Sequence, residues 1–221
     1  EKAASTLRSQ WNVPLLTVKW PREFALQSDA SDATHPIVQR VASVDAASQA
    51  FDAIAYNKGS AVIRMLEASL GETGFRDGIR RYVRRYAYDN TVTDQLWSEL
   101  ASATNRPVID IARDFTLQPG VPLVKAVAGR CESGRTRVTL TQGRFETGTP
   151  SPVALTWRIP VVLQAIDSRA TASTLLGKDG APVSVEVGGC GPVVVNAGQT
   201  GYFRTQYADA DLIRIRQSFG E

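Results

Sequence analysis

The spacing of apolar residues changes once along this 221-residue chain, in a turn-rich segment at residues 117–122. Before the segment, apolar residues recur every three or four positions, as on one face of an α-helix. After it, apolar and polar residues alternate, as along a β-strand with one buried face. The segment contains Pro119-Gly120, a dipeptide that suits a type II turn. The sequence therefore predicts an α+β chain with a helical first half and a second half built from strands.

The first half contains several amphipathic segments with recognisable ends. Residues 60–70 carry an apolar stripe and are followed by glycine, which tolerates the left-handed conformation found after a helix. We expect Asp45 to cap a short helix that runs to Ile54, because its carboxylate can accept a hydrogen bond from a free backbone N–H group. For the same reason we expect Thr73 to cap a helix over residues 75–86. Further helices are expected at residues 1–10, 91–101 and 107–115.

Arginines are concentrated in residues 76–85, R-D-G-I-R-R-Y-V-R-R, within a chain of net charge +3. Such a run can mark a nucleic-acid surface. Because apolar residues also recur through it at helical spacing, we interpret the arginines as the solvent-facing side of a helix and predict no nucleic-acid partner. The chain is 43% apolar and 21% charged, as globular proteins are. It contains no run of eighteen apolar residues, the length that a membrane-spanning helix needs.

The second half contains seven or eight short segments with the period of a strand. Alternation is clearest at residues 155–159 and 183–187. Lys178-Asp179-Gly180 is typical of the turn in a β-hairpin. Strands are also expected at residues 123–127, 138–140, 161–166, 171–176, 193–195 and 202–207. This number predicts an antiparallel β-sandwich, after which residues 210–219 return to helical spacing.

Two polar side chains in the helical half could carry chemistry. Tyr56 interrupts the apolar pattern just before the helix at residues 60–70. A phenol with a pKa of about 10 stays protonated at neutral pH, so Tyr56 can donate a hydrogen bond to an oxyanion that develops in a transition state. The alternative is a buried structural tyrosine with a satisfied hydroxyl. His35, the single histidine, precedes a proline and is interpreted as a structural hydrogen-bonding partner, not as a metal ligand.

The two cysteines, Cys131 and Cys190, lie in short glycine-containing loops of the second half. They can form a disulfide or remain two separate buried thiols. A disulfide implies an oxidising compartment, and on that interpretation we expect the protein to be periplasmic or secreted. The spacing of the two cysteines gives no C-x-x-C metal signature.

Several motifs, in order, resemble the aminopeptidase N family of zinc metallopeptidases, which are gluzincins. They are H-P-I from His35, F-D-A-I-A-Y-N-K-G over residues 51–59, R-M-L from Arg64 and L-G-E-T-G-F-R-D-G over residues 70–78. At the turn-rich segment of residues 117–122, which we call the joint, F-T-L-Q-P-G-V-P is similar to the family's W-x-x-Q-x-G-x-P, with Phe115 where tryptophan is usual. Near the end, N-A-G-Q-T-G-Y-F-R-T-Q-Y resembles the run N-A-G-x-x-G-Y-Y-R-x-x-Y of the family's β-domain.

The resemblance implies a domain order and a reaction. Residues 1–118 would be the helical C-terminal part of a thermolysin-like catalytic domain, residues 119–208 a β-sandwich domain, and residues 209–221 the start of a C-terminal helical domain. The family removes N-terminal residues from peptides, with zinc activating a water, a glutamate as general base and the tyrosine at the position of Tyr56 stabilising the oxyanion.

The zinc site of this class needs H-E-x-x-H and a further glutamate, and one histidine cannot supply it. Because the chain also begins in helical sequence without a cap, we expect it to be a fragment of a longer protein that carries the zinc ligands upstream. We predict that the chain alone binds no zinc and has no peptidase activity.

Two alternatives remain open. The β-sandwich could be a non-catalytic binding module with the helices as its scaffold, although Trp157 is expected in the core and not on a sugar-binding surface. The upstream segment could also have lost its zinc ligands. If the chain is part of a longer enzyme, the helix faces that bear Trp11, Trp20 or Met65 are expected to be exposed and to drive self-association.

Overall fold

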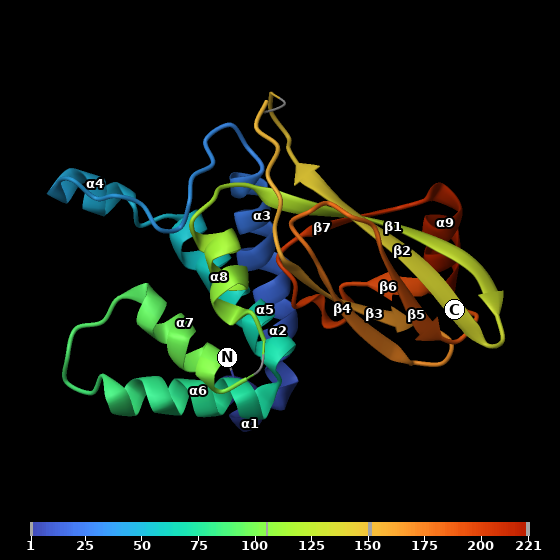
Figure 1. Ribbon diagram of the computed structural model, residues 1–221, viewed down its shortest axis with the longest axis horizontal. Coiled ribbons are helices and arrows are strands. Elements are labelled where there is room, and N and C mark those ends of the chain that lie inside the picture. The colour runs from blue at the N-terminus through green and yellow to red at the C-terminus, as the bar shows by residue number, and fades with distance from the viewer. Residues whose placement is uncertain (1, 105, 150–151, 220–221) are drawn as a thin grey trace.

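The structure is a computed structural model that describes residues 2–104, 106–149 and 152–219, with helices in the first half and two sheets in the second (Figure 1). The helices are α1 (Lys2–Leu7), η1 (Ser9–Trp11), α2 (Val13–Thr17), η2 (Val18–Arg22), α3 (Glu23–Asp29), α4 (Val44–Gln49), η3 (Ile54–Lys58), α5 (Gly59–Leu70), α6 (Glu72–Arg85), α7 (Thr93–Ser102), α8 (Val108–Thr116), η4 (Ala197–Gln199) and α9 (Asp209–Ser218). The strands are β1 (Val121–Glu132), β2 (Arg135–Phe145), β3 (Ile159–Ala165), β4 (Thr171–Leu176), β5 (Val183–Gly188), β6 (Val193–Val195) and β7 (Arg204–Tyr207). The α+β class and the order of its two halves are therefore confirmed.

The strands form a four-stranded sheet, in the order β5-β2-β1-β7, and a three-stranded sheet, in the order β4-β3-β6. All the pairs are antiparallel except one: β1 pairs with β7 in parallel, with Leu123 opposite Arg204. A parallel pair is possible because β7 follows β6 of the second sheet in the chain and is not joined to β1 by a hairpin. Residues near the C-terminus thus lie beside the strand that follows the joint.

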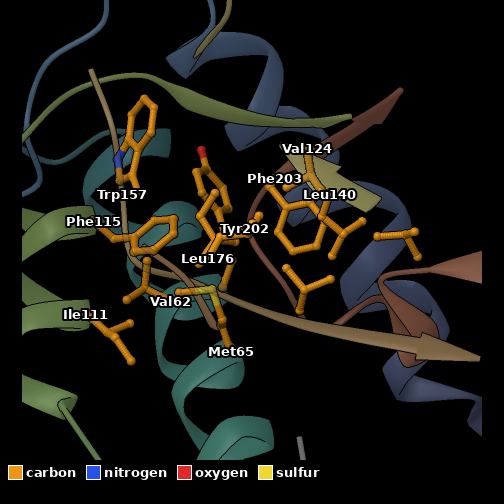
Figure 2. Packing of buried hydrophobic residues seen from close by; sticks show 14 of the residues in the cluster. Val62, Met65, Ile111, Phe115, Val124, Leu140, Trp157, Leu176, Tyr202 and Phe203 are labelled. Atoms are coloured by element: carbon orange, nitrogen blue, oxygen red, sulfur yellow. The ribbon is translucent and has the colours of Figure 1, made fainter. Parts of the chain in front are cut away.

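One buried cluster contains side chains from both halves of the chain. In Figure 2, Met65 of α5 and Phe115 of α8 gather with Tyr202 and Trp157 from the second half. Trp157 is fully buried, as expected from its alternating neighbours, and the Phe115 and Tyr202 rings meet edge to face with centroids 6.5 Å apart. The helices α3, α5 and α8 lie between the α6–α7 pair and the sheets (Figure 1), and side chains of all three belong to the buried cluster that joins the halves.

Two expected helix caps are wrong. Ser43, not Asp45, caps α4: its side chain accepts a hydrogen bond from the Ala46 N–H, and α4 ends at Gln49 instead of reaching Ile54. Thr73 lies inside α6, because α5 and α6 are separated only by Gly71, which has a φ of 78° and occupies both the C-cap position of α5 and the N-cap position of α6.

The strand and hairpin expected around residues 155–180 also differ from the structure. Residues 155–158 precede β3, and the Gln142 side-chain amide there donates to the Trp157 carbonyl and accepts from its N–H, each at 2.9 Å, in place of a neighbouring strand. Lys178-Asp179-Gly180 connects β4 to β5, which belong to different sheets. This turn therefore crosses between sheets and is not the hairpin that its residues suggest.

Several apolar side chains on the first helices are exposed. Leu15, Leu16 and Phe24 are 64%, 51% and 58% exposed, and Trp11 and Trp20 are similarly exposed. Met65 was expected on such a face, but it is 1% exposed, because α5 lies between the other helices and the sheets. No helix among the described residues is long and apolar enough to cross a bilayer.

Candidate active site

Tyr56 lies on η3, a single π-helical turn that leads directly into α5. Its side chain is 59% exposed, and its ring lies 5.8 Å from that of Phe51, measured between centroids. The buried structural alternative for Tyr56 therefore does not hold. The phenol faces outward, where another molecule or chain segment can reach it, and its catalytic role stays a prediction.

Lys58 is two residues further along the same turn and points the opposite way. Residues two positions apart on a helix do not share a face, so the Lys58 side chain runs inward and is fully buried. Its ammonium lies 2.9 Å from Asp29 Oδ2 and donates to the carbonyls of Gln118 and Gly120 at 3.3 and 3.5 Å. Burial lowers the pKa of Lys58, and the contact with Asp29 opposes this effect.

Asp29, at the end of α3, collects hydrogen bonds from three further parts of the chain. Its Oδ1 accepts from the Thr34 hydroxyl at 2.5 Å and from the Gly120 N–H at 2.9 Å, and its Oδ2 accepts from the Tyr202 hydroxyl at 3.1 Å. Burial and the adjacent Asp29 carboxylate raise the pKa of Tyr202 well above its ordinary value, so Tyr202 stays a donor. Residues of the helices, the joint and the second half thus meet around one buried carboxylate.

Arg22 makes a second connection between the halves, close to the first. It is 6% exposed, and its guanidinium donates to the Gly201 carbonyl at 3.1 and 2.8 Å and to the Phe203 carbonyl at 3.4 Å. Beside it, Arg204 pairs with Glu23 at 2.6 Å. The glycine-tyrosine-phenylalanine-arginine run singled out in the sequence is therefore held against η2 and α3.

His35 secures the N-terminal side of the Tyr56 turn. Its Nε2 lies 2.5 Å from Asp52 Oδ2, while Asp52 Oδ1 accepts from the Ala55 N–H at 2.8 Å. The Asp52 carbonyl also accepts from the Tyr56 N–H at 3.1 Å. These contacts give His35 the structural hydrogen-bonding place expected from the sequence.

The His35–Asp52 pair should make folding stability depend weakly on pH. Burial lowers the pKa of His35, but the Pro36 carbonyl and Asp52 outweigh it, so the pKa is raised. Burial raises the pKa of Asp52, but the Ala55 N–H and His35 outweigh it, so the pKa is lowered. The contribution of His35 to the free energy of unfolding is therefore complete below about pH 6.5 and is lost as the pH rises through its folded-state pKa. The contribution of Asp52 is complete above about pH 4 and is lost as the pH falls through its folded-state pKa.

Because His35 is the single histidine, His35→Gln tests this dependence directly. In urea unfolding of the 221-residue chain, we expect the substitution to lower the free energy of unfolding by less than about 1 kcal/mol at pH 5.5, since both partners are partly exposed. At pH 9 we expect almost no change. Equal losses at the two pH values would contradict the pairing.

The cysteines lie away from this site. Cys131 and Cys190 form a disulfide with Cα atoms 5.2 Å apart, which links the end of β1 to the loop between β5 and β6. Of the two alternatives left open by the sequence, the structure therefore has the disulfide.

Comparison with known proteins identifies the family. Residues 2–115, the helical half almost to the end of α8, match the peptidase family M1 domain. The chain belongs to peptidase family M1. The turn that carries Tyr56 and Lys58 lies inside the matched range, and the resemblance to the aminopeptidase N family is confirmed.

Relatives of this M1 chain are similar to it through both halves. They include Probable aminopeptidase 2 of Sulfurisphaera tokodaii (29% identical over 212 residues), Leucyl aminopeptidase of Saccharolobus solfataricus (30% over 214 residues) and Aminopeptidase M1 of Arabidopsis thaliana (32% over 207 residues). These matches cover 96%, 96% and 87% of this chain but 26%, 26% and 23% of the relatives. The chain thus spans about a quarter of the length of these relatives.

The part of the chain that the structure describes offers no group of side chains for the zinc that family M1 implies. In the ranges that the structure describes, no three His, Cys, Asp or Glu side chains form a group that could hold a metal. His35, the single histidine, is engaged with Asp52.

The sequence reasoning missed the residues that hold Tyr56 in place. Lys58 appeared there only as one letter of the motif at residues 51–59, and Asp29 was not singled out. A lysine inside an otherwise apolar segment was the available signal, because a buried ammonium requires a buried acceptor. Nothing in the spacing identified Asp29 as that acceptor.

Proposed function

We propose that this chain is part of a zinc-dependent aminopeptidase that removes N-terminal residues from peptides. It would supply the helical C-terminal part of the catalytic domain (residues 1–118), the β-sandwich domain (residues 119–208) and the start of a further helical domain (residues 209–221). The observation that carries the proposal is the outward-facing phenol of Tyr56, on a turn fixed by buried contacts within the segment that matches family M1. Relatives named as aminopeptidases support peptides as the substrate class.

The proposed role of Tyr56 is electrostatic. When the carbonyl carbon of a peptide bond becomes tetrahedral, its oxygen gains negative charge, and the phenol O–H donates a hydrogen bond to that oxygen. A donor that is held in position before the reaction costs little reorganisation during it. The Lys58–Asp29 contact and the hydrogen bond from the Ala55 N–H to Asp52 support this role, because they fix the turn that carries Tyr56.

Removal of zinc tests the proposed reaction. Chelation of the full-length protein should abolish hydrolysis of aminoacyl-p-nitroanilides, and stoichiometric zinc should restore it. The 221-residue chain alone should bind no stoichiometric zinc and should not hydrolyse these substrates. Elemental analysis measures the bound zinc, and the aminoacyl-p-nitroanilide assay measures the activity. Full activity after complete zinc removal would contradict the proposal, and a full-length protein without zinc or activity would favour the alternative in which the ligands have been lost.

The exposed apolar residues of the first helices support a contact surface for the rest of the longer protein. Leu15, Leu16 and Phe24 are each more than half exposed, and burial of such side chains on association is favourable. We therefore expect the isolated 221-residue chain to sediment as a dimer or larger species at micromolar concentration. Leu15→Ser with Phe24→Ser should shift it toward monomer, whereas Val83→Ser on α6 should not. A chain that is monomeric at every concentration would contradict this expectation.

The proposal includes a periplasmic or secreted location. The disulfide between Cys131 and Cys190 supports it, because disulfides persist mainly in oxidising compartments. The alternative of a carbohydrate-binding module receives no support from Trp157, which is fully buried.

A further inference from the structure

The position of the Tyr56 phenol depends on its backbone. Within the described residues, no hydrogen bond holds the Tyr56 hydroxyl, and its ring is 59% exposed beside Phe51. A side chain held so lightly can be placed reproducibly only if the turn beneath it is fixed. Whatever fixes η3 therefore fixes where the phenol can reach.

Lys58 holds that turn from inside with every donor it has. An ammonium has three N–H groups, and the structure supplies three acceptors: the Asp29 carboxylate and the carbonyls of Gln118 and Gly120. These acceptors come from the end of α3 and from the joint before β1. An apolar side chain at position 58 would fill the same space, but it would not select the rotation of the turn, because hydrophobic contacts are not directional.

Asp29 is itself fixed from several directions, so Lys58 is tied to a rigid acceptor. The carboxylate receives the Thr34 hydroxyl, the Gly120 N–H and the Tyr202 hydroxyl in addition to the Lys58 ammonium. Tyr202 lies 173 residues from Asp29 in sequence and belongs to the second half of the chain. The geometry of the Tyr56 turn is thus set partly by residues outside the helical half.

We propose that Lys58 is a positioning residue for Tyr56, and that the second half of the chain contributes to the active site through Tyr202, Asp29 and Lys58. This inference rests on the proposed function, since it requires Tyr56 to act in catalysis. A catalytic group displaced by about 1 Å can cost on the order of 100-fold in rate. Loosening the buried pair should therefore reduce turnover without removing any group that touches substrate.

The test uses the full-length protein with the double substitution Lys58→Met and Asp29→Asn. The pair then becomes neutral, and the asparagine oxygen can still accept hydrogen bonds from Thr34 and Gly120, so the variant should fold. We expect kcat to fall about 10- to 100-fold, with KM within about threefold. The matched control is Lys178→Met, which removes a lysine of the segment between β4 and β5 that lies 3.1 Å from Asp114 Oδ1, and it should leave kcat unchanged.

A double-mutant comparison separates positioning from general damage. If Lys58 acts through Tyr56, the Lys58→Met and Asp29→Asn pair should change kcat less than about threefold in a protein that already carries Tyr56→Phe. A loss of equal size in both backgrounds would overturn the inference, and so would unchanged kcat in the folded double variant.

The remaining outcomes complete the test. If the double variant does not fold, Tyr202→Phe replaces it: this change removes one donor to Asp29, keeps the ring, and should lower kcat about 3- to 10-fold with unchanged KM. An unaffected kcat in Tyr202→Phe would then overturn the inference. If Tyr56→Phe alone has the turnover of the unmodified protein, the proposed role of Tyr56 fails together with the inference. If kcat falls as expected in Tyr56→Phe but stays unchanged in the double variant, the inference about Lys58 is wrong and the proposed role of Tyr56 stands.

Discussion

Tyr56→Phe in the full-length protein is expected to lower kcat by about 100- to 1,000-fold and to change KM little. The substitution removes one hydroxyl and keeps the ring that lies against Phe51. The lost hydrogen bond forms only as the oxyanion develops, so its absence raises the barrier by about 2.7–4 kcal/mol without weakening substrate binding. Steady-state kinetics with aminoacyl-p-nitroanilides at neutral pH gives both constants.

A second phenol provides the matched control. Tyr88 is also exposed but lies beyond the end of α6, away from η3, and Tyr88→Phe should leave both constants unchanged. Turnover near that of the unmodified protein in Tyr56→Phe would reject the catalytic role. A rise in KM at constant kcat would mean instead that the hydroxyl contributes only to substrate binding.

Lys58→Met is expected to destabilise the folded 221-residue chain by about 3–5 kcal/mol. Both members of the Lys58–Asp29 pair are fully buried, so the single substitution leaves a buried carboxylate without its counter-charge. Asp29 keeps the hydrogen bonds of Thr34, Gly120 and Tyr202, which places the expected loss toward the lower end of that range. Urea unfolding followed by circular dichroism measures the change.

Two comparisons identify the cause of this loss. Lys58→Met with Asp29→Asn should recover most of the stability, because a buried pair that is neutralised on both sides leaves no uncompensated charge. Arg137→Met breaks an exposed pair with Glu186 and should leave the urea midpoint unchanged. If Lys58→Met shifts the midpoint no further than Arg137→Met does, the buried pair does not stabilise the fold.

Local sequence pattern was sufficient for the order of elements. The period of apolar residues changes at 117–122, and in the structure the last helix of the first half ends at Thr116 and β1 begins at Val121. The pattern works because each element must turn its own apolar side chains toward a core. The same pattern placed Tyr56 before α5 and Trp157 in the core.

The sequence pattern did not predict the cap of α4 or the strand pairing after β4. Asp45 and Ser43 can both cap a helix, and the extended backbone at Ser43 decided between them. Lys178-Asp179-Gly180 reverses the chain as turn residues do, but the next strand joins the other sheet. A turn sequence specifies a local backbone conformation and carries no information about which sheet edge is free.

The sequence by itself determined that this chain is α+β, that it belongs with the M1 peptidases, and that its single histidine cannot complete an H-E-x-x-H motif. Only the tertiary structure decided that Tyr56 faces outward while Lys58 reaches inward to Asp29, and that Tyr202 completes that contact from 173 residues away. The physical reason is that periodicity and motifs are properties of adjacent residues. A buried charge finds its partner through packing, which brings together segments that no spacing in the sequence relates.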